Sequence, residues 1–123
     1  MSDERYQELL QLVRNRAGDA FRTAISYDAD DSTVLYVRDD LATDALGDAL
    51  PALLDRARRY EPVVHSDVYD GVGDTQATVE LHEEAAVLIF PGPDESGVVV
   101  SLDRDVAKGL GQFVTSCNEV LES

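Results

Sequence analysis

The residues best suited to catalysis or metal binding are few and widely separated. The chain contains two histidines, His65 and His82, and a single cysteine, Cys117. A zinc site needs several ligands at short spacings, and a nucleophile needs a base beside it. These three residues satisfy neither condition. Cys117 falls among apolar residues at helical spacing, which is typical of a buried structural thiol.

Two pairs of residues remain as candidates if the protein has a site at all. His65 stands two residues before Asp67 in the least regular part of the sequence, where a base and an acid could act together. Arg22 and Arg38 lie on two consecutive predicted strands, so a hairpin would bring them close together. Arg38 is followed at once by two aspartates, and structural ion pairing explains both arginines more simply than ligand binding does.

One segment is similar to the start of a calcium-binding loop. Asp28, Asp30 and Ser32 have the spacing of the first three ligands. The pattern then fails, because Thr33 stands where the loop needs glycine and Asp39 stands where it needs glutamate. A hairpin turn explains the segment better. We therefore predict no metal site, no catalytic residues and no bound cofactor.

The charge of the chain is extreme. Asp and Glu number 25 against 10 Lys and Arg, which gives a formal net charge of −15 and a pI of about 4.2. Lys108 is the only lysine. Such self-repulsion weakens a compact state in dilute buffer but is screened in molar salt. The composition therefore predicts a protein of a salt-in halophile whose surface binds salt cations.

The same charge argues against two classes of partner. Nucleic acids and anionic membrane surfaces both select basic patches, and the one dense basic cluster, 56–59, compensates the end of a predicted helix. The N-terminus has no basic and apolar regions of a signal peptide, and no apolar run approaches the roughly 20 residues of a spanning helix. We expect a cytoplasmic protein.

Periodicity predicts a helix and then a hairpin at the start of the chain. Apolar residues recur at helical spacing over 3–16, where Ser2 or Asp3 can cap the helix and Gly18 can end it. Residues 19–28 and 34–37 alternate as strands. In the first strand, alternation places Phe21, Thr23, Ile25 and Tyr27 on one face.

A second helix is expected after Asp40 or Thr43, with Pro51 either kinking it or marking a restart. A short edge strand could lie near 63–69. Three further strands follow over 75–82, 85–90 and 98–102. Asp103 or Asp105 then caps a last helix, whose apolar stripe is Val106, Leu110, Phe113, Val114, Cys117, Val120 and Leu121.

These elements define one α+β domain over residues 1–123. The order α-β-β-α-β-β-β-α contains mostly hairpins, so we predict an antiparallel sheet of about five strands with three helices packed against it. This order is similar to that of the roadblock/longin-type, profilin-like domains. That resemblance implies a sheet between helices, dimerisation, and a role as an adaptor or small-GTPase regulator.

Three stretches carry a resemblance to a family. Residues 18–22, 34–40 and 97–103 resemble an uncharacterised family of small haloarchaeal proteins of about this length. The resemblance implies a host lineage and supplies no catalytic residues.

Three functions remain open on this basis. The leading expectation is a non-enzymatic regulatory or protein-interaction module that forms a homodimer. The alternative is a small-molecule sensor of the PAS or GAF type, which requires a mostly apolar pocket of roughly 300 Å³ or more between sheet and helices. The third is an enzyme that acts through His65 and nearby acids.

Overall fold

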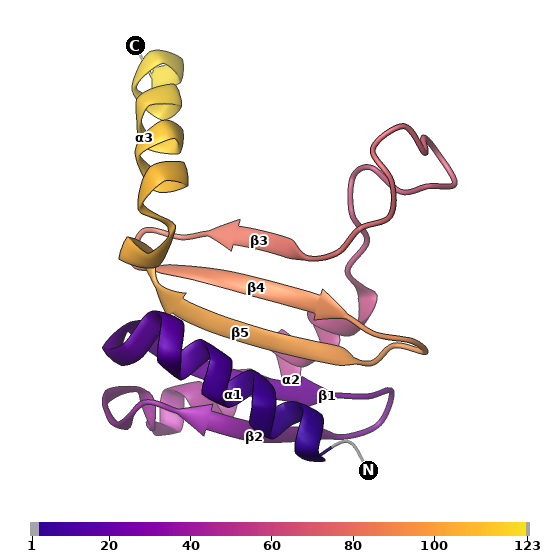
Figure 1. The fold of residues 1–123 in the computed structure, drawn as a ribbon, viewed down its shortest axis with the longest axis vertical. Coiled ribbons are helices and arrows are strands. Elements are labelled where there is room, and N and C mark those ends of the chain that lie inside the picture. The colour runs from indigo at the N-terminus through magenta and orange to yellow at the C-terminus, as the bar shows by residue number, and fades with distance from the viewer. Residues whose placement is uncertain (1–2, 123) are drawn as a thin grey trace.

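The computed structural model describes residues 3–122, which form an α+β domain of three helices and one sheet (Figure 1). The expected fold class and element order are confirmed. The helices are α1 (Asp3–Ala17), α2 (Asp44–Arg59) and α3 (Lys108–Glu122), and the strands are β1 (Phe21–Tyr27), β2 (Ser32–Val37), β3 (Thr78–Leu81), β4 (Ala85–Pro91) and β5 (Gly97–Asp103). Short 3-10 turns at Asp39–Leu41 (η2) and Arg104–Ala107 (η3) precede α2 and α3.

The five strands lie in the order β2-β1-β5-β4-β3, and every neighbouring pair is antiparallel. The β1–β2 hairpin and the three-stranded meander β3–β4–β5 are therefore joined where β1 pairs with β5. This leaves β2 and β3 as the edges. None of the helices within 3–122 is long and apolar enough to cross a membrane.

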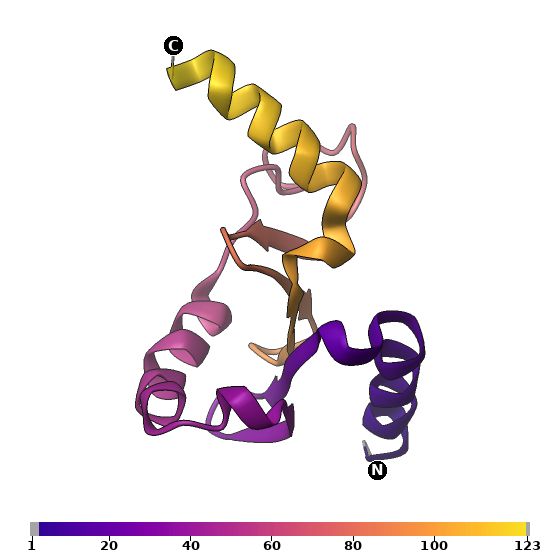
Figure 2. The ribbon, with the colours of Figure 1, turned by 90° about the vertical axis from the view of Figure 1, so that its left-hand side faces the viewer.

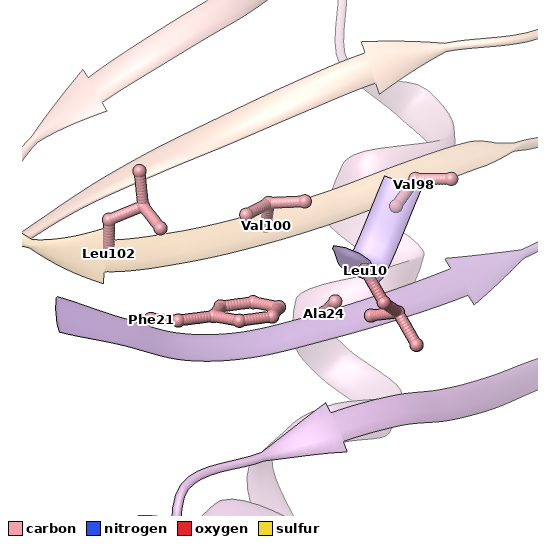
Figure 3. Packing of buried hydrophobic residues seen from close by; sticks show 6 residues of the cluster. All are labelled: Leu10, Phe21, Ala24, Val98, Val100 and Leu102. Atoms are coloured by element: carbon pink, nitrogen blue, oxygen red, sulfur yellow. The ribbon is translucent and has the colours of Figure 1, made fainter. Parts of the chain in front are cut away.

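Helices α1 and α2 cover opposite faces of the sheet, as Figure 2 shows. On the α1 face, Leu10 packs over the β1 and β5 side chains that form the main core (Figure 3). On the other face, Leu54 of α2 packs on Ile25 and Tyr27 of β1. Residues of β1 thus contribute to both clusters, so this central strand is buried on both faces.

Helix α1 forms as its pattern predicts. Its apolar residues Tyr6, Leu9, Val13 and Ala17 pack beside Leu10 against the sheet. The helix ends where Gly18 adopts a φ of 55°, a left-handed conformation that favours glycine. Of the expected caps, Ser2 lies outside the described residues.

The prediction that Phe21, Thr23, Ile25 and Tyr27 share one face of β1 is partly wrong. The pairing of β1 with β5 shifts register between Phe21 and Thr23, which marks a β-bulge or similar irregularity. Phe21 therefore lies in the α1 cluster with Ala24, whereas Ile25 and Tyr27 lie on the α2 side. Simple alternation cannot reveal an inserted residue, and this shift also sends Arg22 towards the α2 side.

Helix α2 is one continuous helix. Thr43 is its N-cap, with the side-chain oxygen accepting the Leu46 N–H at 3.3 Å, and Pro51 lies inside the helix without a restart. The edge strand expected near 63–69 is absent from the described chain, where residues 60–77 form no strand. Their backbone makes local turns instead, such as the Val68 N–H donating to the His65 carbonyl.

Helix α3 is the main departure from the prediction. It extends away from the other helices, beyond the β3 edge of the sheet (Figures 1 and 2), instead of packing on it. Leu110, Phe113 and Leu121 are 50%, 66% and 78% exposed, and the Cys117 thiol is only half-buried. The predictions that the last helix packs on the sheet and that Cys117 is buried are therefore both wrong. Periodicity identifies the apolar face of a helix but not what that face packs against.

The direction of α3 is held by one arginine. The Arg104 guanidinium, in η3, donates to the His82 carbonyl at 2.7 Å, to the Gly111 carbonyl at 3.2 Å and to the Thr115 hydroxyl at 3.3 Å. It thus ties the first half of α3 to the β3–β4 turn. The expected Asp103 cap is wrong, since Asp103 precedes η3 and makes no side-chain capping bond.

Candidate functional site

Two of the four candidate residues meet at one end of the sheet. The Arg38 guanidinium donates to Asp40 at 2.7 Å and to Asp103 at 2.9 Å, and Arg22 donates to the same Asp103 carboxylate at 3.2 Å. Both arginine side chains are 24% exposed. The expected proximity of Arg22 and Arg38 and the pairing of Arg38 with Asp40 are present. We call Arg22, Arg38, Asp40 and Asp103 the arginine cluster.

Three separate segments build the arginine cluster. Arg22 is the second residue of β1, at the register shift, and Arg38 directly follows β2. Asp103 is the last residue of β5, which runs antiparallel to β1 and so ends beside the start of β1. Asp103 was missed as a partner because its sequence position, just before a helix, suggested a cap. The antiparallel pairing of β1 with β5 is the signal that would have found it.

The electrostatics of the cluster favour its charged form. Hydrogen bonds from Arg38, and then from Arg22, hold the pKa of Asp103 below its ordinary value. The bond from Arg38 lowers the pKa of Asp40 in the same way, and both carboxylates raise the pKa of Arg38. These pKa shifts keep Arg38, Asp40 and Asp103 ionised at neutral pH. The arrangement therefore neutralises charge and joins three strand ends, and it offers no proton donor or acceptor for acid–base chemistry near pH 7.

An open groove lies between α2 and the sheet, next to Arg22. Its volume is about 660 Å³. The sheet contributes Ile25, Val87, Ile89 and Val99, and the facing side of α2 contributes Leu46, Leu50, Leu53, Leu54 and Ala57. Leu54 of α2 packs on Ile25 and Tyr27 of β1, with Val99 of β5 beside this cluster, and the groove extends from there over the same face of β4 and β5. We call it the α2 groove.

The α2 groove is polar at one end. Arg22, Thr23 and Ser101 lie there, with the Thr23 and Ser101 hydroxyls hydrogen-bonded across the β1–β5 pair. His82 and Glu80 also line this end and pair with each other at 3.0 Å. Beyond them the sheet side of the groove is apolar, while Arg56 and Tyr60 line it from the C-terminal end of α2. Sequence reading found Arg22 but not this gradient, because the register shift in β1 decides which residues face α2.

His65 and Asp67 lie apart from the arginine cluster. Their side chains are 3.4 Å apart in the irregular segment, and they are 50% and 87% exposed. They line a different hollow, together with Tyr27, Thr78 and residues near the end of β4. Proximity along the chain accounts for this pair, and it has no contact with Arg22 or Arg38.

The other chemical candidates have structural roles. Asp28 accepts the N–H groups of Asp30 and Asp31 through one carboxylate oxygen, which makes the hairpin turn expected of this segment. These two bonds lower the pKa of Asp28. Within residues 3–122, no group of three or more His, Cys, Asp or Glu side chains could hold a metal ion.

The fold and the site together define an α+β domain with an ion-paired cluster beside an apolar groove. Residues 7–122 match the family model described as "Domain of unknown function (DUF7522)", and the chain belongs to this family. No curated protein matches the sequence.

Proposed function

We propose that this chain is a non-enzymatic protein-interaction module that works as a homodimer in the cytoplasm of a salt-in halophilic archaeon. The observation that carries the proposal is the uncovered apolar face of α3. Leu110, Phe113, Val114, Cys117 and Leu121 fall at helical spacing on this face, and Phe113 is 66% exposed near its middle. Contiguous exposed apolar surface of this kind marks interaction sites.

The charge pattern of α3 favours a second copy of the chain as the partner. Residues 109–118 contain no charged side chain, in a protein of which 28% of residues are charged. Two chains of net charge −15 repel each other, so their contact has to lie where charge is absent. Depletion of charge is also what distinguishes the core of protein interfaces from other surface.

The size of α3 is sufficient for a small interface. A helix of 15 residues is roughly 22 Å long and 10 Å across. Two such helices packed along their apolar faces bury on the order of 1,000 Å² in total, near the lower limit of specific interfaces. Arg104 supports the pairing by holding α3 clear of its own sheet.

Two further features support a regulatory function and a salt-in halophilic host. A five-stranded antiparallel sheet between α1 and α2 is the arrangement that the resemblance to roadblock/longin-type domains implies. The lone lysine and the 25 acidic residues support a salt-in host, where bound cations screen the surface.

Light scattering after size-exclusion chromatography in 2–4 M KCl tests the proposal. We expect twice the 13.4 kDa mass of one chain. Phe113→Glu should give the monomer mass with an unchanged far-UV circular dichroism spectrum, because a carboxylate cannot enter a dry helix pair. Val63→Glu is the matched control, since Val63 is 93% exposed but lies outside α3. A monomeric wild-type protein would refute the homodimer.

A small-molecule sensor is the second candidate, and the α2 groove is the observation that favours it. Its volume of about 660 Å³ and its mostly apolar lining are what a sensor of the PAS or GAF type requires. The two candidates use different surfaces, so both functions can belong to one protein.

A further inference from the structure

We infer that the α2 groove binds a small amphipathic carboxylate, with the carboxylate on Arg22 and the apolar body along α2. This inference deepens the sensor candidate and does not depend on the homodimer.

The polarity of the groove sets this direction. On the β1 and β5 part of the lining, the polar side chains Arg22, Thr23 and Ser101 lie together at one end of the groove. From there to the apolar end, the sheet presents Val87, Ile89, Val99 and Ile25 against the leucines of α2. Arg56 and Tyr60, at the C-terminal end of α2, also line the groove, but both are exposed and stay hydrated, whereas Arg22 is part-buried. A ligand with one polar head on Arg22 and one apolar body therefore leaves no part-buried polar group of the sheet unpaired.

The bonding of Arg22 makes it the receptor for an anionic head. Asp103 is held mainly by Arg38, whose guanidinium reaches both of its oxygens at 2.9 and 3.3 Å. Arg22 reaches only one of them, at 3.2 Å, and that is the one side-chain bond of Arg22 within residues 3–122. A guanidinium has five N–H donors in a fixed fork, so Arg22 retains donors for a bidentate contact with a carboxylate.

The remaining charges at this end are compatible with an anion. Glu80 is the one carboxylate among the described lining residues, and its oxygen is engaged by His82 at 3.0 Å. Thr23 and Ser101 add hydroxyls that can turn towards a bound carboxylate. An ammonium head would instead face Arg22 and be repelled by it.

The length of the apolar part limits the size of the ligand. From Arg22 to Ile25 along β1, three residues at a strand rise of about 3.3 Å cover roughly 10 Å. This corresponds to an extended chain of about eight carbon atoms. Branched or cyclic bodies of similar length fit the same description, because the walls are built of leucine, valine and isoleucine side chains.

Titration of the whole protein with three probes of equal length tests the inference. Octanoate, 1-octanol and octylammonium differ only in the head group, and two-dimensional NMR in 2 M KCl follows the amide signals of the groove. We expect octanoate to bind at least five-fold more tightly than octanol, and octylammonium to bind most weakly. Shifted signals should include those of Thr23, Ile25 and Val99.

Variants separate the head site from the groove. Arg22→Gln should weaken octanoate about ten-fold and leave octanol within two-fold, while Arg59→Gln, an exposed arginine on α2, should change neither. Leu50→Trp should fill the groove and reduce binding of both probes. Octanol binding as tightly as octanoate would overturn the anionic head while leaving the groove as a sensor site. Binding of none of the three probes would overturn the inference and the sensor candidate together, with the homodimer unaffected.

Discussion

Asp103 is the residue on which the two arginines of the cluster converge, so its removal affects three strand ends at once. In Asp103→Asn, Arg22 loses its charged partner and Arg38 keeps Asp40 as its charged partner, while the amide oxygen can accept only neutral, weaker bonds from them. Charge-assisted bonds in a part-exposed network are each of modest strength. We expect the free energy of unfolding at pH 7 to fall by about 1–2 kcal/mol, as measured by urea denaturation in 2 M KCl.

The same network predicts a pH dependence with a definite sign. The pKa values of Asp103 and Asp40 are lowered in the folded protein, so the unfolded state binds more protons near pH 4. Their stabilising contribution is therefore complete above the ordinary aspartate value of 3.8 and is lost as the pH falls through the lowered values. The stability difference between wild type and Asp103→Asn should shrink below pH 4. A difference that stays constant down to pH 2 would mean that the ion pairs contribute nothing.

Gly97 lies where two strands and a ring approach closely. A Cβ atom there would stand 2.5 Å from the Tyr27 hydroxyl and 2.7 Å from the Phe90 carbonyl oxygen. Since the carbonyl belongs to the paired strand β4, it cannot move aside cheaply. Gly97→Ala should therefore lower the free energy of unfolding by about 1–3 kcal/mol. The control is Gly47→Ala in α2, where nothing lies within 4 Å, and it should be neutral or stabilising by up to about 1 kcal/mol.

Sequence reading at the residue scale succeeded where a residue acts on its neighbours. The Asp28 turn and the Thr43 cap depend on bonds within three residues, which local patterns encode. It failed where the partner lies far along the chain. The pairing of Asp103 with Arg22 spans 81 residues, and the register shift in β1 is specified by β5 as much as by β1 itself.

Among the elements, α1 and α3 carry similar apolar periodicity but have different surroundings. The apolar face of α1 packs against β1 and β5, whereas that of α3 is exposed on its own chain. Periodicity therefore predicted where both helices lie in the sequence but could not predict what covers them. The α2 groove could not be predicted from the sequence for the same reason, because it depends on how closely α2 packs on the sheet.

Arg104 should control the order of the first half of α3. Its guanidinium reaches the carbonyl groups of His82 and Gly111, so Arg104→Ala should free the base of the helix. We expect amide hydrogen exchange in residues 109–116 to accelerate several-fold while exchange in α1 stays unchanged. Arg104→Lys should restore the protection only in part, since an ammonium lacks the planar fork. Unchanged exchange in α3 would show that the helix is held by other contacts.

At the scale of the whole molecule, net charge and apolar surface act in opposite directions. Each chain carries −15, while the proposed contact along 109–118 carries none. Association therefore gains from apolar burial, which salt preserves, and loses through long-range repulsion, which salt screens. At 0.3 M KCl the Debye length is roughly 6 Å, and at 3 M it is about 2 Å.

The dimer should accordingly become tighter as salt is added. We expect the dissociation constant, measured by sedimentation equilibrium, to fall at least ten-fold between 0.3 and 3 M KCl, because screening removes repulsion while the apolar contact remains. Substituting exposed acids far from α3, as in Asp30→Asn with Asp31→Asn, should tighten the dimer at 0.3 M and have little effect at 3 M. An interface held by ion pairs would behave in the opposite way and weaken with salt. The sign of the slope therefore distinguishes an apolar α3 contact from an ionic one.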